Sequence, residues 1–478
     1  MPLELSKIDK KKINFFHFKQ LDEGDYLLTN DVGDHCLLES VDFSAFITGK
    51  HNQISSAKYL ELKDRSFIRG KIDFDSMSKK YANKNMFLSQ DAGLHIIVVT
   101  LRCDHRCFYC QASARPIASK SLDMDIPTAQ KVVDRIFECK SKCITLEFQG
   151  GEPLLNFKTI EFIVDYAQKK NKTIGKDLRF TVVSNLTFMN TGIIKFLIKN
   201  NVNICSSLDG PEFIHNKHRV SLKNNNTHKN TVKWLKILKR EYKKINFKAD
   251  ALPTVTRYSL PYYKEIINEY LKLGMRSIHL RPVTPFGVSA ATWNKISFSV
   301  EDFLEFYRQA LDYIIELNKD GIKFNERFAL IFLTKIFTDK DPGFLDIRSP
   351  CGAGIGQLAY NFNGDVYTCD EGRMLSRLGD ESFKLGNVNH DSYQEIMGNE
   401  VVKTMCIASC LDALPGCAQC VYKAYCGVCP IANHKKNGNI FNKDSFLCKI
   451  HMGILDYLFS KIKENKVKNI FDSWVRAK

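Results

Sequence analysis

Three cysteines that follow an apolar run are spaced to bind one iron–sulfur cluster. Residues 94–101, LHIIVVTL, are typical of a buried strand. Directly after them the motif CDHRCFYC supplies the thiols of Cys103, Cys107 and Cys110. Three thiolates can hold three irons of a [4Fe–4S] cube and leave the fourth iron open. An open iron can bind the amino and carboxylate groups of S-adenosylmethionine (SAM), and electron transfer from the cluster then releases a 5′-deoxyadenosyl radical that abstracts hydrogen.

The neighbouring residues fit this interpretation and leave two others open. Arg102, His105 and Arg106 lie among the cysteines, so the site is electropositive and favours thiolates. A zinc site would need a fourth ligand, which could be His105 or a distant residue, and three buried structural cysteines would need no metal. The spacing C-x3-C-x2-C after a strand is far more specific than a lone CxxC pair and favours the cluster.

Several later β-type runs also end in glycine or polar residues. Parallel strands bring their carboxyl ends to one edge of a sheet, where the chemistry of such folds is found. We therefore expect these residues to gather near the three cysteines: Gly150, Gly151, Glu152 and Pro153 after one run, Ser184 and Asn185 after the next, then Ser207 and Asp209, and finally Arg281.

Strand-like and helix-like segments alternate between residues 94 and 317, and this order predicts how the site is held. The β-type runs cover 94–101, 143–151, 178–185, 203–210, 247–256 and 277–284. Between them lie amphipathic patterns such as residues 157–171, with Ile160, Ile163 and Ala167 on one helical face. Strand–helix alternation of this kind predicts an α/β fold with a parallel sheet, closed or partly closed as a barrel with six strand–helix units.

The flanking regions read differently. Residues 1–90 contain short strands, turn signals and a helical run, which indicates a small α+β module. We expect the barrel over 91–320, a helical linker over 321–350, a cysteine- and glycine-rich domain over 351–450 where ligands replace a hydrophobic core, and a C-terminal helix over 451–478.

The C-terminal cysteines form a second constellation. The pattern runs Cys351-x12-Gly364-x4-Cys369, then C-x2-C-x5-C-x2-C over residues 417–429, then Cys448. A four-cysteine zinc site from Cys417, Cys420, Cys426 and Cys429 is one interpretation. Five residues between its two pairs is short for a zinc ribbon, and zinc would leave the other cysteines of this region unexplained. The remaining thiols carry no motif and read as small buried hydrophobes: Cys36, Cys139, Cys143 and Cys205.

Composition and charge narrow the class of protein. The chain has 478 residues, 16 cysteines and a formal charge of +16. No apolar stretch is long enough for a membrane helix and no signal peptide is evident, so we expect a cytoplasmic, soluble protein without a membrane partner. Clustered cysteines in such a protein favour metal binding over disulfides. The basic excess is dispersed among asparagines, as in residues 221–244, which favours a solvated surface over nucleic-acid binding.

The motifs together resemble the radical SAM superfamily. Tyr109 stands before the third cysteine as in that family, and Gly150-Gly151-Glu152-Pro153 resembles its GGEP motif, whose strand-edge backbone holds the methionine ammonium. The segment SLDGP, with His215 and Arg219 beyond it, is similar to the peptide-modifying branch. The resemblance implies a radical SAM barrel and further contacts to SAM or substrate from Asn185, Ser207, Asp209 and, as a weaker candidate, Arg281. For Asn185, Ser207 and Arg281, a structural hydrogen-bonding role is an equal alternative.

The C-terminal pattern resembles the SPASM domain, which carries two auxiliary [4Fe–4S] clusters. The resemblance implies an outer cluster on Cys417, Cys420, Cys426 and Cys448. It implies an inner cluster on Cys351, Cys369 and Cys429, with Cys410 as the fourth ligand, Cys406 in reserve, or an open iron that binds substrate. The family has three residues between the fifth and sixth cysteines, whereas this chain has two, Gly427 and Val428.

Finer features point to a peptide substrate. The segments around 348–375 and 409–430 are similar to the His-Xaa-Ser system radical SAM maturases, and residues 26–49 to PqqD-like modules that add a leader peptide to a sheet edge. A packing module without a ligand is the alternative for the latter. Asp370, which follows Cys369, stands where sulfatase-maturing relatives have a proton-abstracting aspartate; its alternative is a structural bond within its own loop.

The predicted function is therefore radical SAM maturation of a ribosomally synthesised peptide precursor, served by a low-potential electron donor such as flavodoxin or ferredoxin, with a second maturase as a further partner. One alternative is a sulfatase-type formylglycine maturase. An alternative from another class is a zinc-stabilised nucleic-acid-binding protein, suggested by the charge and the CxxC pairs.

Overall fold

The computed structural model describes residues 8–21, 24–70, 72–221, 226–243, 249–343, 345 and 347–476. Its N-terminal part is a small sheet of three antiparallel strands, β1 (His17–Gln20), β2 (Tyr26–Thr29) and β3 (His35–Leu38), in that order. Helices α1 (Ser40–Ile47) and α2 (Ser56–Asp64) close a core of their own around Leu28, Phe46 and Phe67. Alternating buried residues along the strands leave this sheet one apolar face, which the helices cover.

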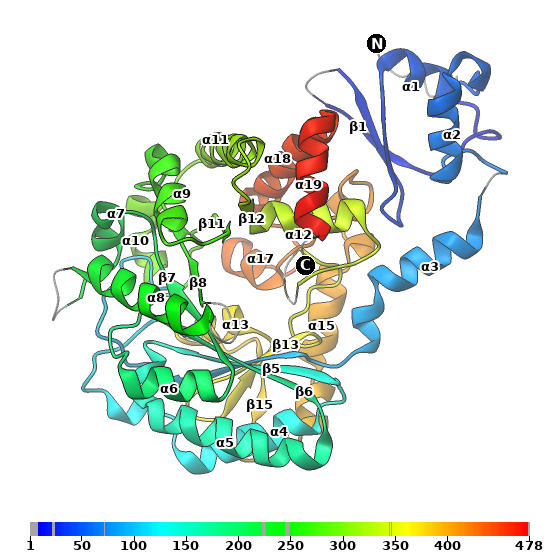
Figure 1. The fold of residues 1–478 in the computed structure, drawn as a ribbon. Coiled ribbons are helices and arrows are strands. Elements are labelled where there is room, and N and C mark those ends of the chain that lie inside the picture. Colours follow the sequence, from blue (N-terminus) through cyan, green and yellow to red (C-terminus); the bar gives the residue numbers. More distant parts are fainter. Residues whose placement is uncertain are drawn as a thin grey trace.

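The central sheet has eight strands in the order β15-β14-β13-β4-β5-β6-β7-β8. Its parallel part consists of β4 (Leu94–Thr100), β5 (Cys143–Gly150), β6 (Asp177–Ser184), β7 (Val202–Ser207) and β8 (Ala249–Leu252). Helices α4 (Ile126–Glu138), α5 (Phe157–Ile174) and α6 (Thr191–Lys199) lie along one side of it (Figure 1). The predicted α/β fold with a mostly parallel sheet is confirmed.

The last two predicted strands are each broken in two. The fifth run forms β8 and β9 (Thr254–Val255), while its first two residues, 247 and 248, lie outside the described part of the chain. The sixth run forms β10 (Ser277–Ile278) and β11 (Arg281–Pro282). β11 pairs in parallel with β9, and β10 pairs with β12 (Asn325–Glu326). The sheet therefore curls from β8 through β9 toward β11 and stays open beyond.

The cysteine-rich region adds to the same sheet, which the sequence analysis does not foresee. β13 (Gln357–Tyr360) pairs in parallel with β4, and β14 (Asp365–Tyr367) and β15 (Lys384–Asn387) follow in antiparallel order. Gly364 forms the turn between β13 and β14 with a φ of +87°, and a side chain there would press on Val388. That conformation accounts for the glycine of the C-terminal motif.

The C-terminal end forms two helices where one was predicted over 451–478. α18 (Ser445–Ile462) begins six residues earlier than expected, and α19 (Asn465–Arg476) follows after a short break. Both pack on α11 (Val300–Lys319) and α12 (Arg327–Phe337). Asp444 caps α18 by accepting a hydrogen bond from the backbone N–H of Phe446, so the helix begins at a cap signal.

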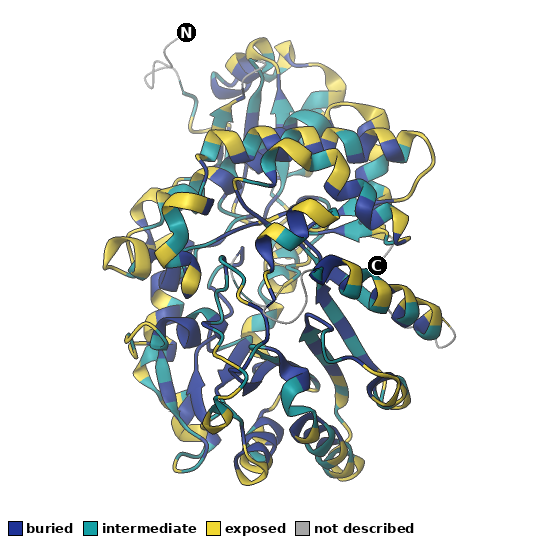
Figure 2. Ribbon diagram, turned by 90° about the vertical axis from the view of Figure 1, so that its left-hand side faces the viewer, coloured by how far each residue is buried: buried dark blue, intermediate teal, exposed yellow. Residues whose placement is uncertain are grey.

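The N-terminal module is tied to the loop between Cys420 and Cys426. Thr29 Oγ1 donates to the carbonyl of Val421 at 2.7 Å, and the Tyr425 hydroxyl donates to the carbonyl of Gly33 at 3.0 Å. Helix α3 (Phe74–Lys84) then leads from the module to the barrel and buries none of its residues (Figures 1 and 2). Among the described helices, none is long and apolar enough to cross a membrane.

Candidate active site and cluster-binding sites

The carboxyl ends of the parallel strands surround an open cavity of about 840 Å³. It is lined by residues that follow or end β4, β5, β6 and β7, as expected for a shared sheet edge. The predicted residues that line it are Cys103, Cys107, Tyr109, Cys110, Gly150, Gly151, Ser184, Asn185, Ser207 and Arg219.

The first three cysteines form one group at this cavity. Burial raises the pKa of the Cys107 thiol to about 12, against the lowering effect of the Arg219 charge, and the adjacent Cys110 thiol adds to the rise. Burial likewise raises the pKa of Cys103, with Cys107 as the next cause. Such thiols stay protonated until a metal displaces the proton. The Cys103 sulfur accepts hydrogen bonds from the backbone N–H of His105 (3.4 Å) and from Asn185 Nδ2 (3.7 Å), so the site offers donors that suit a cluster thiolate.

The two glycines after β5 allow its backbone to approach the first cysteine loop. Gly150 has a φ of +149°, and a Cβ there would overlap the carbonyl oxygen of Thr100. A Cβ on Gly151 would overlap the carbonyl oxygen of Arg102. Only glycine fits these close approaches, which leave bare backbone at the cavity wall.

Glu152 is buried and is not among the described residues that line the cavity, so its assignment as a cofactor contact stays a prediction. Its buried carboxylate accepts hydrogen bonds from Leu154 N–H (3.0 Å), Ser184 Oγ (2.8 Å) and Asn185 N–H (2.8 Å). Burial raises the pKa of Glu152 to about 7 despite these donors. The residue therefore holds the ends of β5 and β6 together, and Pro153 is buried beside it at the start of a short 3₁₀ helix.

Asp209 is also placed behind the cavity wall, not on it. Its carboxylate accepts hydrogen bonds from the Tyr109 hydroxyl (2.5 Å), Arg219 Nε (3.0 Å) and Thr254 N–H (3.0 Å). The Arg219 charge and the nearby histidine His218 hold the pKa of Asp209 well below its usual range in spite of burial. Asp209 thus orients Tyr109 and Arg219, which do line the cavity.

Arg281 and Asp370 lie near the opening. The Arg281 side chain is half exposed and pairs with Glu371 at 3.4 Å, and it is not among the described residues that line the cavity. Asp370 begins helix α13 (Asp370–Ser376) and accepts a hydrogen bond from Arg373 Nε at 2.6 Å. One turn later Met374 reaches the cavity, so α13 brings the cysteine-rich domain to the barrel mouth.

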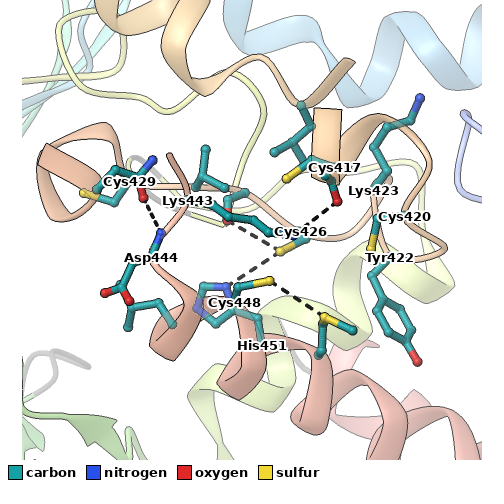
Figure 3. A pocket seen from close by; sticks show the side chains of 17 residues that line it. Cys417, Cys420, Tyr422, Lys423, Cys426, Cys429, Lys443, Asp444, Cys448 and His451 are labelled. Atoms are coloured by element: carbon teal, nitrogen blue, oxygen red, sulfur yellow. Dashed lines mark hydrogen bonds between the residues drawn. The ribbon is translucent and has the colours of Figure 1, made fainter. Parts of the chain in front are cut away.

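A second cavity, of about 590 Å³, is lined by the four cysteines predicted for the outer cluster: Cys417, Cys420, Cys426 and Cys448 (Figure 3). His451 also faces it, with Nδ1 3.7 Å from the Cys426 sulfur. Sequence reasoning missed this histidine. The available signal was its position three residues after Cys448 on α18, which places both side chains on one helical face.

Of the three cysteines predicted for the inner cluster, Cys429 also lines this cavity, whereas Cys351 and Cys369 do not. Cys351 and Cys369 are buried with Phe286 and Met405, and the partly buried Cys429 packs against the same cluster. Figure 3 shows the Cys429 sulfur directed away from Cys426. Burial, followed by the nearby charges of Glu371 and Cys429, raises the pKa of Cys369, so Cys429 adjoins the buried pair as well as the cavity. This position favours two clusters over one zinc ion on the four cysteines 417–429.

Cys410, the predicted fourth ligand of the inner cluster, lies beside the segment that carries Cys351, where Leu411 N–H donates to Ser349 Oγ at 3.0 Å. Helix α15 (Glu400–Ser409) turns Met405 and Ser409 toward Cys351, and the Ser409 hydroxyl accepts a hydrogen bond from Cys351 N–H at 2.9 Å. Cys410 follows at the end of this helix and lines another cavity, beside Ser349 and Cys426. Its thiol raises the pKa of Cys406, so the reserve candidate lies beside Cys410.

Family models match both halves of this site. Residues 97–259 match the radical SAM superfamily, and residues 351–430 match the SPASM iron–sulfur cluster-binding domain. The chain is also 30% identical over 291 residues to the uncharacterized protein MJ0907 of Methanocaldococcus jannaschii, covering 60% of this chain and 89% of that protein. The chain belongs to the radical SAM superfamily. As a radical SAM enzyme with a SPASM domain, it uses SAM and [4Fe–4S] clusters.

Two further relatives have described activities. The radical SAM cyclopropyl synthase TigE of Paramaledivibacter caminithermalis is 23% identical, over 78% of this chain and 74% of TigE. A cysteine-type anaerobic sulfatase-maturating enzyme of Clostridium novyi is also 23% identical, over 76% of this chain and 92% of that enzyme. This radical SAM protein is thus related to both peptide and sulfatase maturases.

Solved structures share its fold. Native anSMEcpe with bound AdoMet superposes with a TM-score of 0.66 at 18% identity, covering 80% of this chain and 99% of that one. Streptococcus suis SuiB bound to precursor peptide SuiA gives a TM-score of 0.54 at 12% identity, covering 92% of this chain and 99% of SuiB. The fold is therefore that of SPASM-containing radical SAM maturases.

Proposed function

We propose that this enzyme is a peptide maturase, which modifies a ribosomally made precursor peptide. SAM, when bound and reductively cleaved, supplies the 5′-deoxyadenosyl radical that takes a hydrogen atom from a side chain or Cα of the peptide. Loss of one more electron and a proton from the peptide, with the electron passing to an auxiliary cluster, would complete a crosslink or an oxidised residue.

The N-terminal module is the observation that favours a peptide over a sulfatase. The SuiB match leaves only 8% of the chain uncovered, and the anSMEcpe match leaves 20%. Even if all of that 8% fell within residues 1–90, it would make up less than half of the module. Most of the module thus has a counterpart in the fold of a protein that was solved with its precursor peptide. The module's sheet has β1 and β3 at its edges, and neither outer edge has a strand partner among the described residues. A leader peptide could extend either edge.

The first cavity supports the following roles. Cys103, Cys107 and Cys110 would hold the SAM-binding cluster. The bare backbone at Gly150 and Gly151 would accept hydrogen bonds from the methionine ammonium, since glycine lets a ligand approach the strand edge closely. Four polar residues that line the same cavity would contact the rest of SAM or the peptide: Tyr109, Asn185, Ser207 and Arg219.

Asp370 is our candidate for the residue that removes a proton from the peptide. Asp370 is buried and lies one turn from Met374, which lines the cavity. Glu147 is also nearby: burial raises the pKa of Glu147, and the Asp370 charge adds to that rise. Arg373 holds the carboxylate in a fixed orientation at 2.6 Å. A positioned carboxylate of this kind typically contributes about 10²–10⁴-fold to a proton-transfer step.

For the auxiliary clusters we assign Cys417, Cys420, Cys426 and Cys448 to the outer one and Cys351, Cys369 and Cys429 to the inner one. This division rests on the two groups described above. We retain residues 1–90, 91–320, 321–350, 351–450 and 451–478 as working domain limits. A low-potential flavodoxin or ferredoxin remains our proposed electron donor, together with a second maturase as a further partner.

Co-expression tests the substrate directly. The enzyme is produced anaerobically with a short peptide encoded beside its gene, and the peptide is compared by mass spectrometry with material from cells carrying Cys107→Ala. A mass loss of two hydrogen atoms that needs Cys107 supports a crosslink or desaturation. An unchanged peptide alongside active SAM cleavage would contradict the proposal for that peptide.

A formylglycine maturase is the second candidate, favoured by the Clostridium novyi relative, of which this chain covers 92%. It would oxidise a cysteine or serine side chain to an aldehyde. A hydrazide probe captures that aldehyde on a peptide containing the sulfatase motif, whereas a crosslinked peptide gives no capture.

A further inference from the structure

Three charged side chains form a buried network between the two groups of auxiliary cysteines. Lys335, on α12, places its Nζ 3.2 Å from Oδ2 of Asp341, and Arg348 places its Nε 3.5 Å from Oδ1 of the same carboxylate. Arg348 Nη2 also donates to the backbone carbonyl of Asp341 at 2.9 Å. The three side chains are only 3%, 12% and 6% exposed, respectively. The network is thus built into the interior.

Each cation adjoins a different cysteine group. Lys335 Nζ donates to the carbonyl of Tyr425 (3.2 Å), the residue before Cys426, and also to the carbonyl of Ile347. Burial raises the pKa of the Cys426 thiol to about 12, and the Lys335 charge is among the smaller effects that act to lower it. Arg348 precedes Cys351 by three residues, and its guanidinium is attracted to that sulfur when it is ionised.

The backbone geometry keeps the network close to the cysteine loop. A Cβ on Gly427 would overlap the backbone nitrogen of Arg348, so the segment 347–348 lies directly against the turn between Cys426 and Cys429. Gly427 is one of the two residues in this turn, where the SPASM pattern has three. Arg348 is further held by Phe87, whose ring centre is 3.8 Å from its guanidinium carbon.

The charges within the network do not cancel. Two cations share one carboxylate, and Oδ1 of Asp341 and Nε of Arg348 have no hydrogen-bond partner among the described residues beyond their 3.5 Å ion pair. Burying an uncompensated charge is strongly unfavourable. An iron–sulfur cluster on four thiolates carries about −2 in its oxidised form. Two such anions on either side of the network would supply the missing negative charge.

We propose that Lys335 and Arg348, bridged by Asp341, raise the reduction potentials of the auxiliary clusters, with Lys335 acting on the outer cluster and Arg348 on the inner one. This proposal rests on the cluster assignment within the proposed function. Reduction adds one electron, and hence one negative charge, to a cluster, and a fixed cation nearby stabilises that charge. The network thereby favours transfer of an electron from the peptide to the clusters.

Potentiometric titration followed by electron paramagnetic resonance tests the proposal on the anaerobically reconstituted full chain, without peptide. Signals are assigned with Cys420→Ser, which removes an outer ligand, and Cys369→Ser, which removes an inner one. Lys335→Met should lower the outer midpoint and Arg348→Met the inner one, each by about tenfold in the reduction equilibrium, or about 59 mV for one electron. Asp341→Asn should raise both midpoints, and the charge-conserving Lys335→Arg should leave the outer one near that of the wild type.

Midpoints that stay unchanged in iron-replete Lys335→Met and Arg348→Met would overturn the proposal, as would equal shifts at both clusters whichever cation is removed. If a methionine variant fails to load iron, the midpoints of Asp341→Asn decide the question. This variant keeps both cations and leaves no carboxylate unpaired, and the proposal predicts that both of its midpoints rise. A chain that loads only the first cluster also overturns it. Since no peptide is present, the expected shifts would stand even if the peptide substrate proved wrong.

Discussion

The carboxylate of Glu152, at the end of β5, accepts a hydrogen bond at 2.8 Å from the backbone N–H of Asn185, at the end of β6. Ser184 Oγ donates to the same carboxylate at 2.8 Å. The buried glutamate of the GGEP motif thus fixes the two strand ends that form one wall of the SAM cavity. Asn185 in turn reaches Asp104 (3.1 Å) and the Cys103 sulfur, so the contact extends to the cluster loop.

Glu152→Gln should weaken both the fold and SAM binding. In the variant, the side-chain NH₂ would replace a carboxylate oxygen that accepts hydrogen bonds, so it would face an N–H or O–H group that can only donate to it. A buried donor left without an acceptor costs about 1–3 kcal/mol. We expect a lower melting temperature and roughly tenfold weaker SAM binding by anaerobic calorimetry, a factor that corresponds to about 1.4 kcal/mol. Asp165→Asn, on the exposed side of α5, serves as the control. Equal melting temperature and affinity in both variants would show that Glu152 has no such role.

Lys84 predicts how stability changes at alkaline pH. Burial, followed by repulsion from Lys335, lowers the pKa of Lys84 from 10.5 to about 8. Between these values the folded chain loses a proton that the unfolded chain keeps, so stability should rise with pH across this window. Relative to Lys84→Met, the wild type should therefore gain melting temperature from pH 8 to pH 10.5. Lys79→Met, at an exposed site on α3, should follow the wild type. A constant difference between wild type and Lys84→Met would contradict the shift.

Asp370→Asn tests the proposed proton acceptor. If Asp370 removes a proton from the peptide, the amide should lower peptide product by at least about 10²-fold. SAM cleavage without peptide should stay near the wild-type rate, since the residue does not hold SAM. Glu371→Gln, the next residue in the chain, is the matched control and should retain product formation. Full product from Asp370→Asn would assign the residue a purely structural bond to Arg373.

The cysteine division predicts iron content. Cys410→Ser should retain the wild-type iron, because its thiol lies beside Cys406 and lines the cavity next to Ser349 and Cys426. Cys429→Ser should lose iron and the inner-cluster signal, measured by iron and sulfide assay after anaerobic reconstitution. The reverse pattern would restore Cys410 as a ligand and contradict the placement of α15.

The strand-edge part of the site could be predicted because it depends on local order. Runs of buried β-branched residues indicate strands, and parallel strands place their ends together, which is why Gly150, Asn185 and Ser207 meet at one cavity. The direction of each side chain could not be predicted in this way. Glu152 and Asp209 follow the same strand ends but turn inward, into hydrogen bonds with partners that no local pattern reveals.

The cysteine-rich region was harder for a related reason. The pairing of β13 with β4 joins residues more than 250 positions apart, and no periodic pattern predicts such a contact. A helix over residues 400–409 was not anticipated either. That helix turns Met405 and Ser409 toward the inner cysteines, and Cys410 follows at its end.

Formation of 5′-deoxyadenosine tests the central claim most directly. Reconstituted wild type and Cys107→Ala are incubated anaerobically with SAM and dithionite, after iron and sulfide have been measured in both. We predict 5′-deoxyadenosine from the wild type and none from Cys107→Ala, whose first cluster lacks a ligand. Equal product from both proteins, or none from an iron-replete wild type that binds SAM, would contradict radical chemistry at Cys103, Cys107 and Cys110.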